Sequence, residues 1–72
     1  MLREDVESSV IASMGYAPAE RVLELEFRDS GDIYDYFDVP SEVYAEFREA
    51  KSKGTYLNQV FKNLGYPYTR VR

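Results

Sequence analysis

The cationic side chains in the last third of the chain are the first candidates for chemistry. Residues 50–72 contain five lysines and arginines and no acid, a net charge of +5, whereas residues 1–49 contain four arginines and 13 acids, a net charge of −9. A basic segment can contact phosphates, and free backbone N–H groups at the start of a helix can bind an anion. We therefore expect RNA or tRNA as one candidate partner, bound through Lys51, Lys53, Gly54, Asn58, Lys62, Arg70 and Arg72.

Structural roles explain several of these positions equally well. The basic residues can be solvated surface charge that attracts the acidic part of the same domain. Gly54 can break a helix, and the hydroxyl of Ser52 can cap the helix that follows. The residues assigned structural roles are Tyr34, Tyr36, Pro40, Ser52 and Tyr56.

Tyr34 and Tyr36 raise a separate question, because their spacing places both rings on one face of a strand. Such rings either stack nucleotide bases on an open sheet or fill a core beneath helices. The residue between them is Asp35, and burying a carboxylate in mid-strand without a partner is costly. We therefore expect both tyrosines to face the core and Asp35 to face outward.

The outward face of the predicted sheet offers an alternative kind of interaction. Its acids and apolar side chains could dock a basic partner protein or a second copy of the chain. In a phage or mobile element, a small acidic domain could also inhibit a host protein by covering its nucleic-acid-binding site. The negative charge of this face disfavours RNA there. The residues of this alternative interface are Ile11, Glu24, Glu26, Asp35 and Phe37.

Catalysis and metal binding find little support in the residue inventory. The chain has no histidine and no cysteine, which removes the usual general base, the commonest metal ligand and any thiolate. Asp29, Asp32 and Asp35 lack the glycine and glutamate that complete an EF-hand calcium loop. Glu24 and Glu26 have the spacing of an exposed strand face. We expect no enzyme, no catalytic residue, no cofactor and no metal ion.

Hydrophobic periodicity predicts three strands followed by two helices. Short turns between the strands favour an antiparallel meander, and apolar stripes after Val39-Pro40 favour amphipathic helices. The expected fold is α+β, in the order β-β-β-α-α, with both helices packed on one face of a three-stranded sheet. The predicted strands are residues 9–16, 21–28 and 33–37, and the predicted helices are residues 41–50 and 55–64.

A chain of 72 residues is expected to form one domain, spanning residues 1–72. Residues 8–70 form its expected core region, and residues 1–7 are expected to be flexible. Gly65 is the expected C-cap of the second predicted helix. The tail that follows it is either a short extended segment docked by a tyrosine or a frayed end.

The order of several short motifs resembles the KTSC domain family. The resemblance spans about residues 8–70. It implies association with RNA as a hypothesis and brings no catalytic residues with it. The family takes its name from a C-terminal extension of certain bacterial lysyl-tRNA synthetases, and it includes small stand-alone bacterial and phage proteins. The motifs are Ser9 before a short first strand, LELEF at 23–27, Tyr34-x-Tyr36, Val39-Pro40 and Ser52-x-Gly54-x-Tyr56.

No targeting or membrane segment is expected. The N-terminus, MLREDVESSV, is charged and lacks the apolar region of a signal peptide. No apolar run approaches the roughly 20 residues of a membrane span. We expect a soluble cytoplasmic protein.

Overall fold

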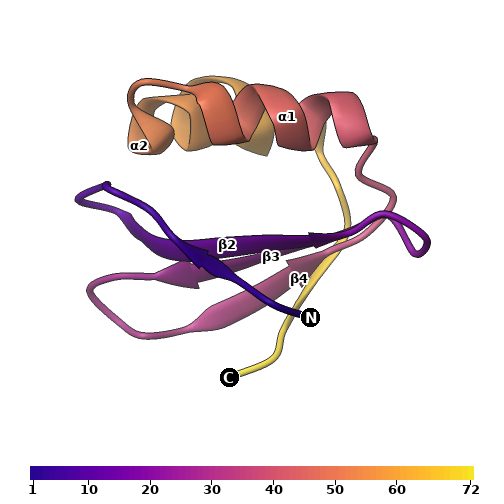
Figure 1. The fold of residues 1–72 in the computed structure, drawn as a ribbon, viewed down its shortest axis with the longest axis horizontal. Helices are drawn as coiled ribbons and strands as arrows, with labels where there is room; N and C mark the ends of the chain where they lie inside the picture. The colour runs from indigo at the N-terminus through magenta and orange to yellow at the C-terminus, as the bar shows by residue number, and fades with distance from the viewer.

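A five-stranded antiparallel sheet forms one layer of the molecule. In this computed structural model, which describes all 72 residues, the strands lie in the sheet in chain order, so each pairs with the next. The sheet is therefore a meander with β1 and β5 at its edges (Figure 1). The strands are β1 (Glu4–Asp5), β2 (Ile11–Ala17), β3 (Val22–Phe27), β4 (Ile33–Tyr36) and β5 (Tyr68–Arg70).

The three central strands confirm the predicted antiparallel meander. The predicted number of strands is wrong, because β1 and β5 add one strand at each edge of the sheet. β1 has two residues and β5 has three, too few to show an alternating pattern. The tail is thus an extended segment, paired with β4. Residues 1–7, expected to be flexible, contain β1, whose Glu4 lies opposite Met14 of β2.

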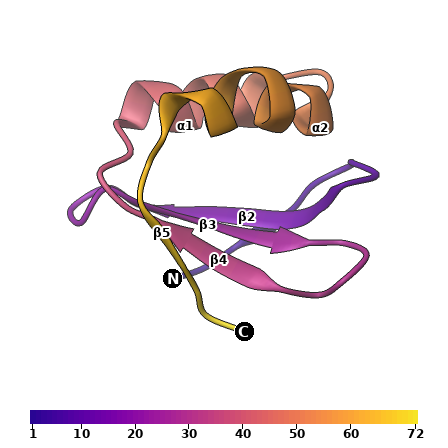
Figure 2. The same cartoon turned by 180° about the vertical axis from the view of Figure 1, so that it is seen from behind.

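Two helical segments cover one face of the sheet, as predicted (Figure 1, Figure 2). The first is α1 (Ser41–Glu49). The second begins as α2 (Lys53–Tyr56) and continues through the π-helical turn η1 (Leu57–Phe61) and the 3-10 turn η2 (Lys62–Leu64). We call residues 53–64 the second helix. Neither segment combines the length and the apolar composition that a membrane crossing would require.

The predicted residues at the helix ends are confirmed, although the second helix begins at Lys53, two residues before the predicted start. Pro40 directly precedes α1. The hydroxyl of Ser52 accepts the backbone N–H of Thr55 at 3.2 Å, which satisfies one of the free donors at a helix start. Gly65 has a φ of 71° and follows the second helix in the left-handed conformation, where a residue without Cβ is favoured.

Ile11 lies in the core, and its predicted place on the outward face is wrong. The register of β2 against β3 shifts between Ile11 and Ser13: Ile11 lies opposite Phe27, and Ser13 lies opposite Glu26. One extra residue, Ala12, is therefore accommodated in β2 as a bulge, and a shift of one residue turns side chains to the other face of a strand. Ile11 is fully buried as a result.

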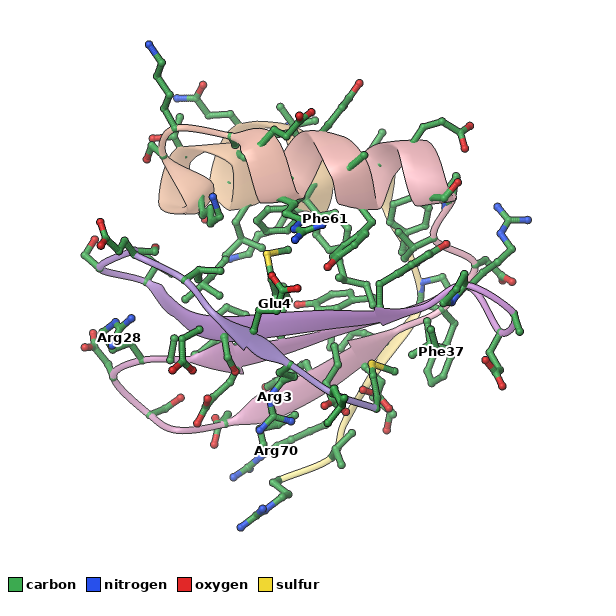
Figure 3. The ribbon with its side chains drawn as sticks, viewed as in Figure 1. Arg3, Glu4, Arg28, Phe37, Phe61 and Arg70 are labelled. Atoms are coloured by element: carbon green, nitrogen blue, oxygen red, sulfur yellow. The ribbon has the colours of Figure 1, made fainter.

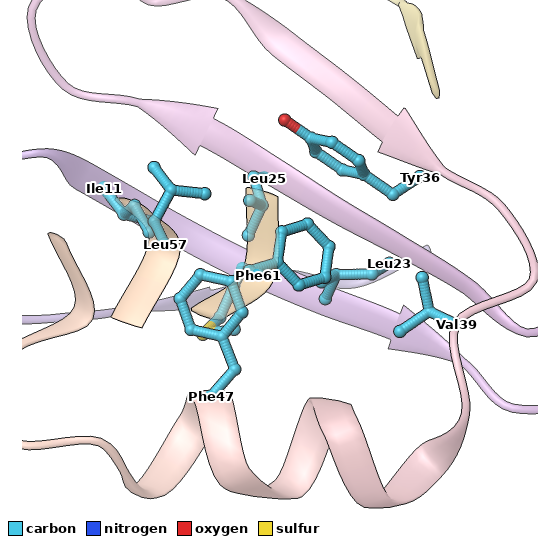
Figure 4. Packing of buried hydrophobic residues seen from close by; sticks show 9 residues of the cluster. Ile11, Leu23, Leu25, Tyr36, Val39, Phe47, Leu57 and Phe61 are labelled. Atoms are coloured by element: carbon cyan, nitrogen blue, oxygen red, sulfur yellow. The ribbon is translucent and has the colours of Figure 1, made fainter. Parts of the chain in front are cut away.

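The core fills the space between the sheet and the helices. Phe61 stands at its centre, with its ring centroid 4.9 Å from that of Tyr36 on β4 and 5.2 Å from that of Phe47 on α1 (Figure 4). It therefore connects the sheet to both helical segments. The buried cluster consists of Ile11, Met14, Leu23, Leu25, Tyr36, Val39, Phe47, Leu57 and Phe61.

Candidate nucleic-acid interface

Tyr34 and Tyr36 both lie on the helix-facing side of the sheet. Tyr34 is opposite Leu25, and Tyr36 is opposite Leu23; directly opposed residues of two strands share a face. Tyr36 is 8% exposed, whereas Tyr34 is half-buried. Burial, followed by the neighbouring Tyr34 and Tyr68, raises the pKa of Tyr36 to about 12. Tyr36 is therefore a neutral core residue, and Tyr34 lies between the core and the surface.

β5 adds an exposed ring to this pair and borders a groove. Tyr68 lies opposite Tyr36, and its ring centroid is 5.5 Å from that of Tyr36 and 5.6 Å from that of Tyr34. The groove has a volume of about 770 Å³. Most of its lining residues come from the second helix, from β4 and β5 and from the turn before β4. Figure 2 shows the chain descending from the second helix to β5. Its aromatic lining consists of Phe27, Tyr34, Tyr36, Phe61, Tyr66 and Tyr68. We call it the aromatic groove.

Charged side chains border the aromatic groove. Lys62 and Asp32 are among its lining residues. Lys62 is exposed and makes no ion pair in the structure. A carboxylate oxygen of Asp32 lies 3.0 Å from Nη2 of Arg70. Arg70 of β5 lies opposite Tyr34 of β4. Because Asp32 lines the groove, its ion pair holds the guanidinium group of Arg70 at the edge of the groove.

The structure divides the predicted nucleic-acid-binding residues between two places. Lys62 lines the aromatic groove and Arg70 reaches it through Asp32. Arg72 follows β5, where its carbonyl accepts the N–H of Ile33 at 2.8 Å. The remaining four residues do not line the groove: Lys51 precedes the second helix, and Lys53, Gly54 and Asn58 belong to its start and middle.

Structural contacts involve three residues near the start of the second helix. A Cβ atom on Gly54 would lie 2.9 Å from Cγ2 of Val10, so the helix can approach the residue that precedes β2 this closely only with glycine at this position. Nζ of Lys53 donates to the carbonyl of Ala50 at 2.9 Å. Tyr56 packs with its ring centroid 4.8 Å from that of Phe47. Tyr56 thus packs against the core as expected, whereas Gly54 lies within α2 and does not break a helix; its structural role is the close approach to Val10.

The opposite face of the sheet is acidic, as predicted, but the N-terminal segment covers part of it. Arg3 and Phe37 lie on this side, away from the helices (Figure 3). The guanidinium of Arg3 pairs with Glu24 at 2.5 Å and donates from Nε to the Ser13 hydroxyl at 2.9 Å. That hydroxyl donates in turn to Glu26 at 2.8 Å. Glu24 is only 9% exposed as a result.

Asp35 and Glu24 are neighbouring carboxyl groups on this face, and each shifts the pKa of the other. They lie opposite each other on β4 and β3. Burial and then the contact with Glu24 raise the pKa of Asp35 to about 6. Burial also acts to raise the pKa of Glu24, but the hydrogen bonds from Arg3 and Asp35 outweigh it and lower that pKa. Oδ1 of Asp35 is buried without a donor, which agrees with a carboxyl group that holds its proton more readily than usual.

Sequence reasoning missed three residues of the aromatic groove. The sequence indicates Tyr66 and Tyr68 only as the tyrosines that could dock the tail, and Asp32 only as part of an incomplete calcium loop. The three residues of β5 are too few for periodicity to reveal the strand that places Tyr68 at the groove. No pattern in the sequence indicates that this short segment pairs with β4 across more than 30 residues of intervening chain.

Comparisons with known proteins identify relatives of the whole chain. The model of the KTSC domain family matches residues 7–66. An uncharacterised protein of Stutzerimonas stutzeri is 45% identical over 71 residues, which cover 99% of each chain. The crystal structure of a KTSC domain protein from Yersinia pestis superimposes with a TM-score of 0.91, at 37% identity, and covers 99% of this chain and 97% of that one.

A second kind of relative is a much longer protein. A lysine–tRNA ligase of Nostoc is 46% identical over 56 residues, which cover 78% of this chain. A ligase of Nostoc punctiforme is 41% identical over the same length. In both, the matched segment is 10% of the ligase, so the likeness concerns one small part of those proteins.

Proposed function

The chain belongs to the KTSC domain family, and from that premise we propose that it binds single-stranded RNA in the aromatic groove without catalysing a reaction. One observation carries the proposal: exposed and half-buried tyrosines line the same groove as Lys62, a cation without an ion pair, and the Arg70–Asp32 ion pair lies at its edge. Neither feature would support the proposal without the other.

The aromatic side chains supply surfaces on which bases can stack. Tyr68 is 63% exposed, and Tyr34 and Tyr66 are half-buried, so parts of three rings can meet a ligand. Stacking of a base on an aromatic side chain contributes about 1–3 kcal/mol and tolerates any base. The groove volume of about 770 Å³ falls in the range of roughly 300–1,000 Å³ that is usual for sites enclosing small ligands.

The cations supply contacts to the backbone of the same strand. Lys62 lines the groove and makes no ion pair, and Arg70 lies at the edge of the groove in its ion pair with Asp32. Single-stranded RNA fits these features better than a duplex, because only unpaired bases can turn into a groove and stack. The net charge of −4 opposes RNA at long range, so we expect weak binding that falls steeply as salt rises.

The lysine–tRNA ligases provide a setting that agrees with RNA binding. A segment related to this chain forms part of enzymes whose name states that they act on tRNA. We extend that setting to this chain as part of the proposal: its ligand would be RNA, with the unpaired regions of tRNA as candidates, and its location would be the cytoplasm.

The acidic face supports a protein-interaction role less well. Of the five residues expected there, Ile11 lies in the core and Glu24 is held by Arg3. Glu26 accepts a hydrogen bond from Ser13, and Phe37 is half-buried. Most of this face is thus engaged within the domain, and we favour the aromatic groove as the binding surface.

A matched pair of lysine variants tests the proposal. Lys62→Ala removes a cation that lines the groove, and Lys51→Ala removes one exposed cation outside it. Both change the net charge equally, so a difference between them reports on the groove. We expect Lys62→Ala to weaken binding of a short single-stranded RNA and to reduce the slope of log K against log salt by about 0.7, while Lys51→Ala resembles the wild type.

Two results would contradict the proposal. Equal losses in the two variants would mean that RNA senses only the overall charge. Absence of binding by the wild-type protein at low salt, with both short RNA and tRNA, would exclude RNA as the ligand.

A further inference from the structure

We propose that Asp32 competes with RNA phosphate for the guanidinium group of Arg70 and thereby limits the affinity of the aromatic groove for RNA. The inference rests on the proposed function, since it concerns how the same groove is regulated. It starts from the presence of one carboxylate among the side chains that line a groove otherwise suited to an anionic strand.

The main chain holds Asp32 at this position independently of Arg70. Asp32 ends the turn between β3 and β4, where its carbonyl accepts the N–H of Phe27 at 2.9 Å. Its own N–H donates to the hydroxyl of Ser30 at 3.1 Å. Its side chain is 29% exposed. The carboxylate therefore remains at the groove even when its partner moves.

Arg70 is free to change partner. Its Nη2 lies 3.0 Å from Oδ1 of Asp32, and its side chain is 63% exposed. Its Nε makes one further, long contact of 3.4 Å to the carbonyl of Arg72. A guanidinium group binds phosphate and carboxylate with the same planar set of donors. An exposed ion pair holds its partners weakly, so phosphate can replace Asp32.

The exchange has an unfavourable consequence for RNA. A phosphate at Arg70 must either displace the carboxylate or lie close to its negative charge, and both weaken binding. Lys62 has no such competitor, because it makes no ion pair in the structure. In the wild-type protein, we therefore expect Lys62 to provide the main phosphate contact and Arg70 to contribute little.

A charge-matched pair of variants tests the inference. Asp32→Asn removes the competitor, whereas Asp29→Asn removes the same charge from an exposed residue of the same turn that forms no hydrogen bond or ion pair through its side chain. Affinity for a short, fluorescent single-stranded RNA is measured by anisotropy over a salt series. We expect Asp32→Asn to bind roughly two- to fivefold more tightly at low salt. Its slope of log K against log salt should be steeper by about 0.7, because one more phosphate is contacted.

The comparison separates this inference from the proposed function. The gain should disappear when Arg70→Ala is added to Asp32→Asn. Equal gains in Asp32→Asn and Asp29→Asn would overturn the inference, since long-range charge would explain both. Weaker binding by Asp32→Asn would overturn it as well, because Asp32 would then contact RNA favourably. In either case, binding by the wild type with sensitivity to Lys62→Ala would leave the proposed function standing, whereas no binding by any variant would refute both.

Discussion

Tyr36 of β4 and Tyr68 of β5 lie opposite each other with ring centroids 5.5 Å apart, yet the first is 8% exposed and the second 63%. The boundary between the core and the surface thus runs between two adjacent rings on one face of the sheet. This relationship arises because the helices cover Tyr36 through Phe61, while β5 lies at the edge of the sheet. Aromatic residues of the core therefore continue without a break into the lining of the aromatic groove.

The two tyrosines should therefore respond differently to truncation. Tyr36→Ala should destabilise the domain by about 3 kcal/mol or more, because it removes a large buried ring; this approaches the whole stability of roughly 3–5 kcal/mol available to a domain of this size. Tyr68→Ala should cost about 1 kcal/mol or less but should weaken RNA binding by about 1–3 kcal/mol. Urea unfolding and RNA titration measure the two effects. Loss of stability without loss of binding in Tyr68→Ala would assign Tyr68 a structural role only.

Gly54 should not tolerate a methyl group. In Gly54→Ala the new Cβ would lie 2.9 Å from Cγ2 of Val10, and a valine side chain has little rotamer freedom with which to move away. We expect a loss of about 1–3 kcal/mol in the free energy of unfolding. In the double variant with Val10→Ala, the combined loss should be smaller than the sum of the single losses. Additive losses would show that the two residues do not conflict sterically.

The N-terminal segment should contribute to stability through Arg3 more than through its other ion pair. Arg3 pairs with Glu24, whose side chain is 12% exposed, whereas Arg48 of α1 pairs with Glu4, whose side chain is 63% exposed. Arg3→Ala leaves a mostly buried carboxylate without its partner and should cost about 1–3 kcal/mol. Arg48→Ala should change stability by less than about 1 kcal/mol. Equal losses in the free energy of unfolding of the two variants would show that the Arg3–Glu24 ion pair stabilises the domain no more than the exposed Arg48–Glu4 pair.

Asp35 should make the stability of the domain fall as pH rises through the weakly acidic range. Its pKa is raised from 3.8 to about 6, so the folded state holds a proton that the unfolded state releases between about pH 4 and pH 6. Stability decreases with pH wherever the folded state binds more protons. The lowered pKa of Glu24 acts in the opposite direction, because its contribution is lost as pH falls. The contribution of Asp35 must therefore be isolated with a variant.

Asp35→Asn provides this isolation, because it keeps the shape of the side chain and cannot titrate. The stability of the variant relative to the wild type should rise from pH 4 to pH 7, as the wild-type carboxyl group becomes charged. Urea unfolding at a series of pH values measures the difference. Asp29→Asn, which removes an exposed carboxylate with no hydrogen bond, serves as the control. A difference that stays constant with pH would show that Asp35 is an ordinary surface acid.

Local signals in the sequence were sufficient to predict β3, the ends of the second helix and the orientation of β4. The alternation of Leu23, Leu25 and Phe27 predicted β3 because each side chain of a strand points opposite to the next. Ser52 and Gly65 predicted the ends of the second helix because their chemistry satisfies free backbone groups or permits a positive φ. The position of Asp35 predicted which side of β4 faces the helices.

Features that depend on pairing between distant segments were not predictable. The bulge that turns Ile11 inward depends on the register between β2 and β3, and a single strand carries no signal for it. The aromatic groove requires β5 to pair with β4, which joins Tyr68 to Tyr34 and Arg70 to Asp32. Of the residues that the charge asymmetry of the sequence singles out, only Lys62 lines the groove, and Arg70 reaches its edge through the ion pair with Asp32.

The most direct test of RNA binding in the aromatic groove is an NMR titration of the tyrosine ring protons with a short single-stranded RNA at low salt. We predict upfield shifts for Tyr34, Tyr66 and Tyr68, because bases that stack on these rings shield their protons, and we predict that the shifts diminish as salt is added. Tyr44, whose ring stacks on that of Tyr16 at 4.8 Å outside the groove, should not shift and serves as an internal control. Unchanged rings of Tyr34, Tyr66 and Tyr68, or shifts confined to residues 51–58, would contradict binding in the groove.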